Sequence, residues 1–272
     1  YGYHCNLLTV MGANQKFVRT SGPDWNIDFD AVEALITPRT KAIIVNTPGN
    51  PSGKVWSRAE LNRIALILEK HDLFAITDEI YEYMLYDDRE HISLASIPGA
   101  FERTITLSGF SKTYNMTGWR LGYAVGPANI ISKMGLLSDL IYICAPTPLQ
   151  HGVAEAFEMD DDYFKEMGEA YERKRELMCT TLEEIGFIVP WPQGSYYVLA
   201  DFSPLRERFE GFEDDMAASL TLVEKAGVGT VVGRSFFNND LDGSSCLRFC
   251  FAKEYPVLLD ACERLKKAFL PA

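Results

Sequence analysis

The chain has 272 residues, of which 47% are hydrophobic and 24% are charged, as in ordinary globular proteins. Its net charge is −12 and its isoelectric point is near 4.9, so its surface would repel phosphates and nucleic acid is not an expected partner. No apolar run reaches the length that spans a bilayer, so no membrane partner is expected either. An anionic ligand would therefore depend on a few local arginine and lysine side chains.

The cysteines form no CxxC pair and the four histidines are scattered, so we expect no metal site. The cysteines are Cys5, Cys144, Cys179, Cys246, Cys250 and Cys262. We expect them to be buried free thiols in a reducing compartment, which indicates a cytoplasmic protein. The first residues lack the basic and apolar regions of a signal peptide.

The first half of the chain alternates between predicted strands and helices. Short apolar runs predict strands at 41–46, 73–77, 103–109 and 121–126. Ser57 and Glu60 match a capping box, which predicts that a helix begins there and continues to about His71. Buried strands joined by helices predict an α/β fold, with a mostly parallel central sheet covered by helices on both faces.

The second half has a different pattern. Residues 148–186 are mostly helix-forming, and Asp160, Asp161 and Asp162 suit the N-terminus of a helix. The remaining residues predict strands at 195–202, 228–232 and 246–252 and helices at 212–226 and 255–269. This α+β pattern predicts a smaller C-terminal domain at 159–272, following a large domain at 1–158.

Two basic residues follow predicted strands, where ligands bind in open α/β sheets. Lys112 lies in a loop of small residues, and its amine could form a Schiff base with an aldehyde. Arg120 lies between Gly118 and Gly122, and its guanidinium suits bidentate phosphate binding. Taken singly, Lys112 could be a surface charge and Arg120 half of a surface salt bridge.

Three further residues are candidates for ligand contacts. Asp78 ends a buried strand, where a carboxylate needs a partner such as a pyridinium nitrogen, although it could instead cap a helix. Asn50 lies in a rigid loop of prolines and glycines that could aim its amide at a ligand or be only a turn. Arg248 lies in an apolar strand and requires an anionic partner, which could be a ligand or a carboxylate of the protein.

The order and spacing of these residues resemble the class I/II aminotransferases, which are pyridoxal-phosphate (PLP) enzymes of fold type I related to aspartate aminotransferase. The matching strings are NTPGNPSG, DEIYEYMLYD, SGFSKTYNMTGWRLGYAVG and CLRFCFA. The resemblance extends from Tyr3 to the last helix. It also implies that the N-terminal part of the large domain is missing from this chain.

The resemblance implies a role in cofactor binding for each matched residue of the first half. Lys112 would form a Schiff base with PLP and later move a proton, and Asp78 would bind the pyridine nitrogen. Tyr81 and Asn50 would hydrogen-bond the phenolic oxygen of the ring. Arg120 would bind the phosphate, and Ser111 or, as an alternative, Ser108 would add a hydroxyl to that site.

In the second half, the resemblance implies that Arg248 binds the α-carboxylate of an amino-acid substrate. The implied reaction is transfer of an amino group from an α-amino acid to a 2-oxo acid by a ping-pong mechanism, in a homodimer. Other enzymes of this fold remain open as alternatives, among them carbon–sulfur lyases, cyclopropane-forming synthases and decarboxylases. So does a non-catalytic PLP-sensing domain. A nicotinamide site at Gly227–Gly233 is disfavoured because no helix is predicted to follow these glycines.

Overall fold

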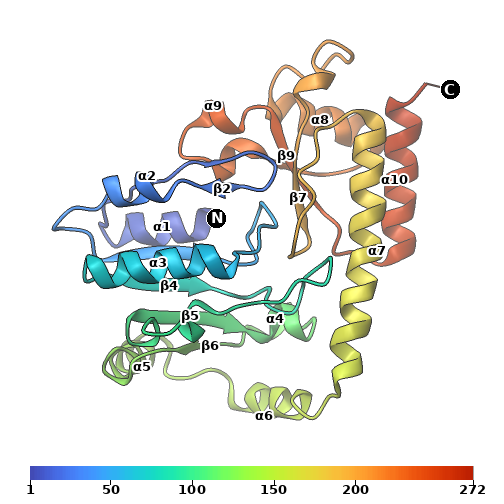
Figure 1. Cartoon of the computed structure of the whole chain (residues 1–272). Coiled ribbons are helices and arrows are strands. Elements are labelled where there is room, and N and C mark those ends of the chain that lie inside the picture. Colours follow the sequence, from blue (N-terminus) through green and yellow to red (C-terminus); the bar gives the residue numbers. More distant parts are fainter. Residues whose placement is uncertain (272) are drawn as a thin grey trace. The chain divides into compact units, whose positions relative to one another are not determined.

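The computed structural model describes residues 1–271, apart from the side chain of Asp240. The chain divides into two compact units (Figure 1). The central unit comprises Asp28–Gly49 and Val55–Gly168, and the C-terminal unit comprises Tyr1–Ile27, Asn50–Lys54 and Glu169–Ala272. The domain ranges inferred from the sequence, 1–158 and 159–272, stay a prediction, since the two units draw on different segments.

The central unit is built on a four-stranded sheet in the order β3-β4-β5-β6. Strands β3 (Ala42–Asn46), β4 (Phe74–Asp78) and β5 (Thr104–Gly109) are parallel, and β6 (Gly122–Val125) is antiparallel to β5. These strands lie within one residue of the predicted ranges. The expected α/β class with a mostly parallel sheet is confirmed.

Helix α3 (Arg58–Lys70) runs beside β4 and covers one face of this sheet (Figure 1). The predicted capping box is present: the Ser57 hydroxyl accepts from the Glu60 amide at 3.3 Å, and the Glu60 carboxylate accepts from the Ser57 amide at 2.8 Å. Residues at helical spacing on α3 pack on the buried side of β4. The cluster contains Leu61, Ile64, Leu68, Leu73, Ala75 and Leu94.

The rest of the central unit is mostly helical, and one of its helices, α5 (Ala128–Tyr142), is unusual in its exposure. Its other helical elements are α2 (Phe29–Ala34), η1 (Leu94–Ser96), η2 (Phe101–Arg103), α4 (Phe110–Thr113), η3 (Thr117–Trp119) and α6 (Thr147–Ala156). Helix α5 is rich in apolar residues but buries none of its side chains in the described structure. Helix α7 (Asp161–Ile185) begins with acidic residues, as predicted.

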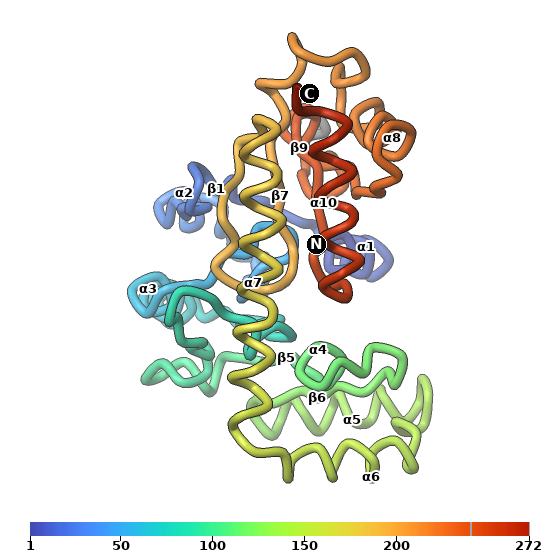
Figure 2. The backbone as a smooth tube through the Cα atoms, turned by 90° about the vertical axis from the view of Figure 1, so that its right-hand side faces the viewer, coloured from blue at the N-terminus to red at the C-terminus, as the bar shows by residue number. Residues whose placement is uncertain are grey.

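The C-terminal unit contains an antiparallel sheet in the order β7-β9-β8, formed by Tyr197–Asp201, Cys246–Cys250 and Val231–Val232. Helix α10 (Tyr255–Phe269) lies beside α8 (Asp215–Ala226) (Figure 2). The remaining elements are α1 (Gly2–Val10), β1 (Thr20–Ser21), β2 (Asn26–Ile27), η4 (Ser203–Leu205), η5 (Gly233–Phe236) and α9 (Asp240–Gly243).

The six cysteines are free, but the expectation that they are all buried is wrong. Cys179 and Cys262 are buried in the packing of α7 and α10, whereas Cys144 and Cys250 are exposed. Cys250 ends β9, and its side chain falls on the outward side of an alternating strand. Within residues 1–271, no helix combines the length and apolar character that crossing a membrane requires.

Candidate active site

One edge of the central sheet collects most of the predicted site residues. In the strand register Asn46 pairs with Asp78, Asp78 pairs with Leu107, and Gly109 pairs with Gly122. The C-terminal ends of three parallel strands therefore meet the N-terminal end of the antiparallel β6. Asp78 ends β4 at this edge, and Tyr81, Ser111, Lys112 and Arg120 lie in the segments that lead from it, so the topology brings five predicted residues to the same edge.

Lys112 lies in α4, a single helical turn that continues directly from β5. The Thr113 hydroxyl donates to the Gly109 carbonyl at 3.3 Å, and the Tyr163 hydroxyl donates to the Thr113 carbonyl at 2.9 Å. The Lys112 side chain is half-buried. The turn that presents this amine is thus anchored both to the strand before it and to α7.

Asp78 and Tyr81 lie at the end of β4 and in the turn after it. The Asp78 carbonyl accepts from the Asn46 side-chain amide at 2.9 Å and from the Thr47 backbone at 3.0 Å. Its carboxylate accepts from the Ile80 amide at 3.4 Å. Tyr81 is buried, with 4% of its surface exposed. Hydrogen bonds from the neighbouring strand therefore fix the backbone that carries the Asp78 carboxylate.

Arg120 and Ser111 have donors that the described protein leaves available. The Arg120 guanidinium donates to the Thr117 carbonyl at 3.0 Å and, within residues 1–271, pairs with no carboxylate, so the salt-bridge alternative is wrong there. In the same part of the chain the Ser111 hydroxyl makes no hydrogen bond. Available donors beside a lysine suit an anion.

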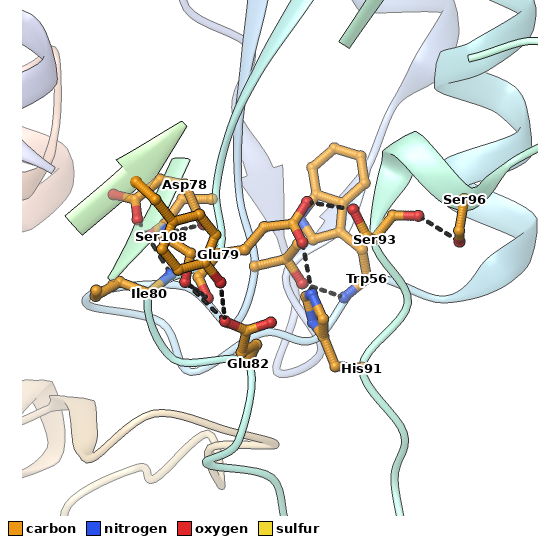
Figure 3. A network of polar contacts seen from close by, with 12 residues as sticks. Trp56, Asp78, Glu79, Ile80, Glu82, His91, Ser93, Ser96 and Ser108 are labelled. Carbon is orange, nitrogen blue, oxygen red and sulfur yellow. Dashed lines mark hydrogen bonds and ion pairs between the residues drawn. The ribbon is translucent and has the colours of Figure 1, made fainter. Parts of the chain in front are cut away.

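Glu79, the residue after Asp78, belongs to a buried polar network (Figure 3). Glu79 is 1% exposed, and its carboxylate contacts the His91 Nε2 at 2.7 Å and accepts from the Ser93 hydroxyl at 3.0 Å. A buried carboxylate requires such partners. Two residues from the loop before η1 therefore hold Glu79, and with it the backbone between Asp78 and Tyr81.

Glu82 provides a second polar contact in this region (Figure 3). Its carboxylate accepts from the Ser108 hydroxyl at 2.7 Å and from the Tyr123 hydroxyl at 3.1 Å. Burial, together with the negative charge of Glu82, raises the pKa of Tyr123 to about 12, although the Ser108 hydrogen bond lowers it. Tyr123 is therefore a neutral donor at physiological pH. Because Ser108 donates to a carboxylate, Ser111 is the better candidate for an anion.

The other two predicted residues, Asn50 and Arg248, meet each other within the C-terminal unit. The Arg248 Nη1 donates to the Asn50 Oδ1 at 2.8 Å. The guanidinium lies between two rings, with centroids 4.1 Å away at Tyr197 and 4.8 Å away at Phe236. Its buried Nε has no hydrogen-bond partner. Within the described chain Arg248 forms no ion pair, so the alternative of a protein carboxylate as its partner is wrong there.

Sequence reasoning did not identify several residues that shape these sites. Glu79 and Glu82 stand in the matched string DEIYEYMLYD, but nothing there indicates that they bind His91, Ser108 and Tyr123. Those contacts depend on sheet register and on a distant loop. Of the two aromatic residues around Arg248, Tyr197 lies in a predicted strand, and nothing in the sequence indicates that Phe236 contacts Arg248.

Comparison with known proteins decides the family. Residues 1–265 match the model of the family described as "Aminotransferase class I and II". The chain belongs to the class I and II aminotransferase family. This confirms the resemblance inferred from the sequence and, with it, PLP as the cofactor. The fold type I architecture is confirmed as well.

Individual relatives agree with this assignment. The chain is 34% identical over 259 residues to kynurenine–oxoglutarate transaminase 1 of Rattus norvegicus, covering 90% of this chain and 61% of that protein. It is 36% identical over 246 residues to an aspartate aminotransferase of Pyrococcus abyssi, covering 90% and 61%. The structure of N-succinyldiaminopimelate aminotransferase from Mycobacterium tuberculosis matches with a TM-score of 0.91 at 33% identity, covering 98% of this chain and 69% of that one. The chain thus spans about three fifths of the length of these curated relatives.

The observed donor set fits PLP. Arg120 and Ser111 offer donors that a phosphate could use, and Asp78 is a half-buried carboxylate at the same sheet edge, suited to a pyridinium nitrogen. Lys112 supplies an amine one turn after β5. Within residues 1–271, no group of three metal-ligating side chains is placed to hold a metal ion.

Proposed function

We propose that this protein transfers the amino group of an α-amino acid to a 2-oxo acid, using PLP held by Lys112, in a ping-pong sequence. The observation that supports the proposal is the strand register: Asp78 ends β4 beside β5, and Lys112 and Arg120 belong to the segment that joins Gly109 of β5 to its partner Gly122 of β6. The relatives' names, transaminase and aminotransferase, favour transfer over lyase chemistry.

Bound PLP would supply an aldehyde that condenses with amines and a ring that accepts the electron pair released at the substrate α-carbon. The Lys112 amine would hold that aldehyde and, once displaced by the amino acid, would move the proton from the α-carbon. The Asp78 carboxylate would keep the ring nitrogen protonated, because an opposite charge favours the charged form. The backbone hydrogen bonds that fix Asp78 make this carboxylate a rigid partner.

The remaining residues would bind and orient. Arg120 and Ser111 would hold the phosphate, while Tyr81 and Asn50 would donate to the phenolic oxygen of the cofactor. Arg248 would bind the substrate α-carboxylate, since its buried Nε and its stacked guanidinium present donors without an ion-pair partner in the described chain. Its bond to Asn50 sets the plane of the guanidinium.

The names of the relatives differ in substrate: kynurenine and oxoglutarate for one, and aspartate, an aromatic amino acid or methionine for others. We therefore propose the substrate class and no single donor. We also propose a homodimer, supported by the exposed apolar surface of α5, and a cytoplasmic location, supported by the free cysteines.

The test is an absorbance spectrum of the purified protein with PLP, before and after borohydride, followed by peptide mass spectrometry. We expect a visible band that borohydride removes, with the cofactor fixed on the peptide that contains Lys112. Lys112→Ala should lack the band, whereas Lys165→Ala, which removes an exposed lysine of α7, should keep it. No band in the wild type, or fixation on another lysine, would contradict the proposal. Transfer would be contradicted if the amino group of the donor is released as ammonia and is not passed to an added 2-oxo acid.

A further inference from the structure

The backbone of Arg120 has a conformation that its own side chain does not favour. Its φ and ψ are 58° and 39°, in the left-handed region, and it directly follows η3. A bulky residue there is uncommon and persists only when its surroundings impose the geometry. Neighbouring contacts must therefore fix the turn that directs this guanidinium.

On one side, the turn is fixed by the close approach of β5 and β6. A Cβ at Gly109 would lie 2.8 Å from the Leu121 carbonyl oxygen, and a Cβ at Gly122 would lie 2.9 Å from the Ser108 carbonyl oxygen. The Phe110 amide donates to the Leu121 carbonyl at 3.3 Å. These backbone contacts fix the C-terminal side of Arg120 against the strand that leads to Lys112.

On the other side, the indole of Trp119 packs against the backbone of α6 at Gly152. A Cβ at Gly152 would lie 2.9 Å from the indole Cζ3 and 3.1 Å from the Cη2. The ring therefore occupies the space that a side chain at position 152 would fill. Trp119 is the residue before Arg120, so any displacement of its ring acts on the left-handed turn.

We propose that Trp119, seated on Gly152, is a positioning residue that aims the Arg120 guanidinium at the phosphate of the cofactor. The proposal rests on the proposed function, in which Arg120 binds that phosphate. Gly152 is then required for close packing, not for backbone flexibility, because its backbone is helical. Trp119 acts through Arg120 and needs no contact of its own with the cofactor.

The experiment compares the affinities of PLP and pyridoxal, which lacks the phosphate, by titration of the full chain. The variants are Gly152→Ala and, as a matched control, Gly168→Ala, which adds the same methyl group inside helix α7 where nothing lies within 4 Å. We expect Gly152→Ala to raise the Kd for PLP about tenfold, since part of a charge-assisted hydrogen bond is lost, and to leave the Kd for pyridoxal unchanged. Gly168→Ala should change neither Kd.

Three further variants make the outcome decisive: Arg120→Ala, Trp119→Phe, and Trp119→Phe combined with Gly152→Ala. Arg120→Ala sets the full contribution of the phosphate contact. In a Trp119→Phe background the smaller ring leaves room for the new methyl group, so adding Gly152→Ala should have little further effect. Trp119→Phe alone should weaken PLP binding selectively, which tests the proposal even if Gly152→Ala folds poorly.

The outcomes separate this inference from the proposed function. If Arg120→Ala removes the preference for PLP over pyridoxal but Gly152→Ala and Trp119→Phe bind as the wild type does, the positioning role of Trp119 is wrong. An equal loss of PLP and pyridoxal affinity in these two variants would also overturn it, because the effect would be general. If the wild type itself binds PLP no better than pyridoxal, the phosphate assignment of the proposed function is wrong as well.

Discussion

The guanidinium of Arg248 lies between the rings of Tyr197 and Phe236, an arrangement that limits its rotation. Replacing Phe236 with leucine keeps the site apolar but removes one ring face. We expect a loss of about 0.5–1 kcal/mol in carboxylate binding, or a two- to fivefold rise in KM for the amino donor, with kcat nearly unchanged. Steady-state kinetics would measure it.

Two results would bear on this prediction. Arg248→Lys should raise KM further, because an ammonium cannot reproduce the bidentate fork of a guanidinium. If Phe236→Leu lowers kcat and leaves KM unchanged, the ring does not act through carboxylate binding.

Asp215 and Arg234 form an ion pair in the C-terminal unit, and its contribution to stability is expected to depend on pH. The Asp215 side chain is fully buried and accepts from the Arg234 backbone at 2.9 Å and from its Nε at 2.6 Å. Burial alone would raise the pKa of Asp215, but the hydrogen bonds and charge of Arg234 outweigh it and hold this pKa below its ordinary value. The stabilisation is therefore complete above the unfolded pKa, about 3.9, and is lost as the pH falls through the lower folded pKa.

Removing Arg234 tests this coupling. Arg234→Ala leaves a buried carboxylate without its guanidinium, and we expect a loss of about 3 kcal/mol at pH 7, at the low end for such pairs because Arg234 is partly exposed. The deficit should shrink near pH 3, where Asp215 of the variant is protonated. Urea unfolding at both pH values measures it. Lys70→Ala, which breaks the exposed pair with Glu33, should cost less than about 1 kcal/mol, and an equal cost would refute the argument.

The sequence predicted site residues that lie near strand ends but not residues whose contacts depend on distant partners. Asp78 ends β4, Lys112 lies in the turn after β5, and Arg120 lies just before β6, and these strand ends were predictable from apolar runs. Glu82 could not be identified, because its contacts with Ser108 and Tyr123 require the register of β5 with β6. Nothing local to Gly152 indicates the ring that packs on it.

At the scale of elements, the conformation of the loop after β3 requires a glycine at position 53. Gly53 has a φ of +68°, and a Cβ there would collide with Pro192. The Gly53 carbonyl accepts from the Gln193 and Gly194 amides, both at 2.9 Å. These contacts attach the loop that carries Asn50 to the segment before β7, and so stabilise the Asn50–Arg248 bond.

Gly53→Ala is therefore expected to destabilise the protein more than Gly99→Ala, where φ is +81° but nothing lies within 4 Å. Both variants carry the strain of a left-handed alanine, about 1 kcal/mol, and Gly53→Ala adds a collision of about 1–3 kcal/mol. Thermal unfolding measures the difference. Only Gly53→Ala should weaken amino-acid binding. Equal melting temperatures for the two variants would show that the loop yields to the new methyl group.

Elements were predictable where a local signal exists. The capping box fixed the start of α3, and the last helix begins and ends where its periodicity predicts. The strand predicted at 228–232 is only two residues long, because Gly227 caps α8 and Gly233 begins η5. The order of the strands depends on long-range pairing, which no local pattern contains.

At the scale of the whole molecule, α5 stands apart. A helix that is apolar yet buries no side chain in the described chain is expected to have its surface covered by another molecule or segment. Leu137, Leu140 and Ile141 are 57%, 73% and 77% exposed. The proposed homodimer would bury this surface, which no sequence feature other than the composition of the helix indicates.

Leu140→Glu combined with Ile141→Glu tests whether this surface forms the dimer contact. Charges inside an apolar interface are costly, so we expect the dimer dissociation constant to rise at least about tenfold, with an unchanged melting temperature for the monomer because neither side chain is part of the core. Sedimentation velocity over a concentration series measures the change. Leu66→Glu, at a 59% exposed leucine of α3, should leave the dimer intact. A wild type that sediments as a monomer throughout the micromolar range, or a double variant that dimerises as tightly, would show that α5 is covered by something other than a second copy.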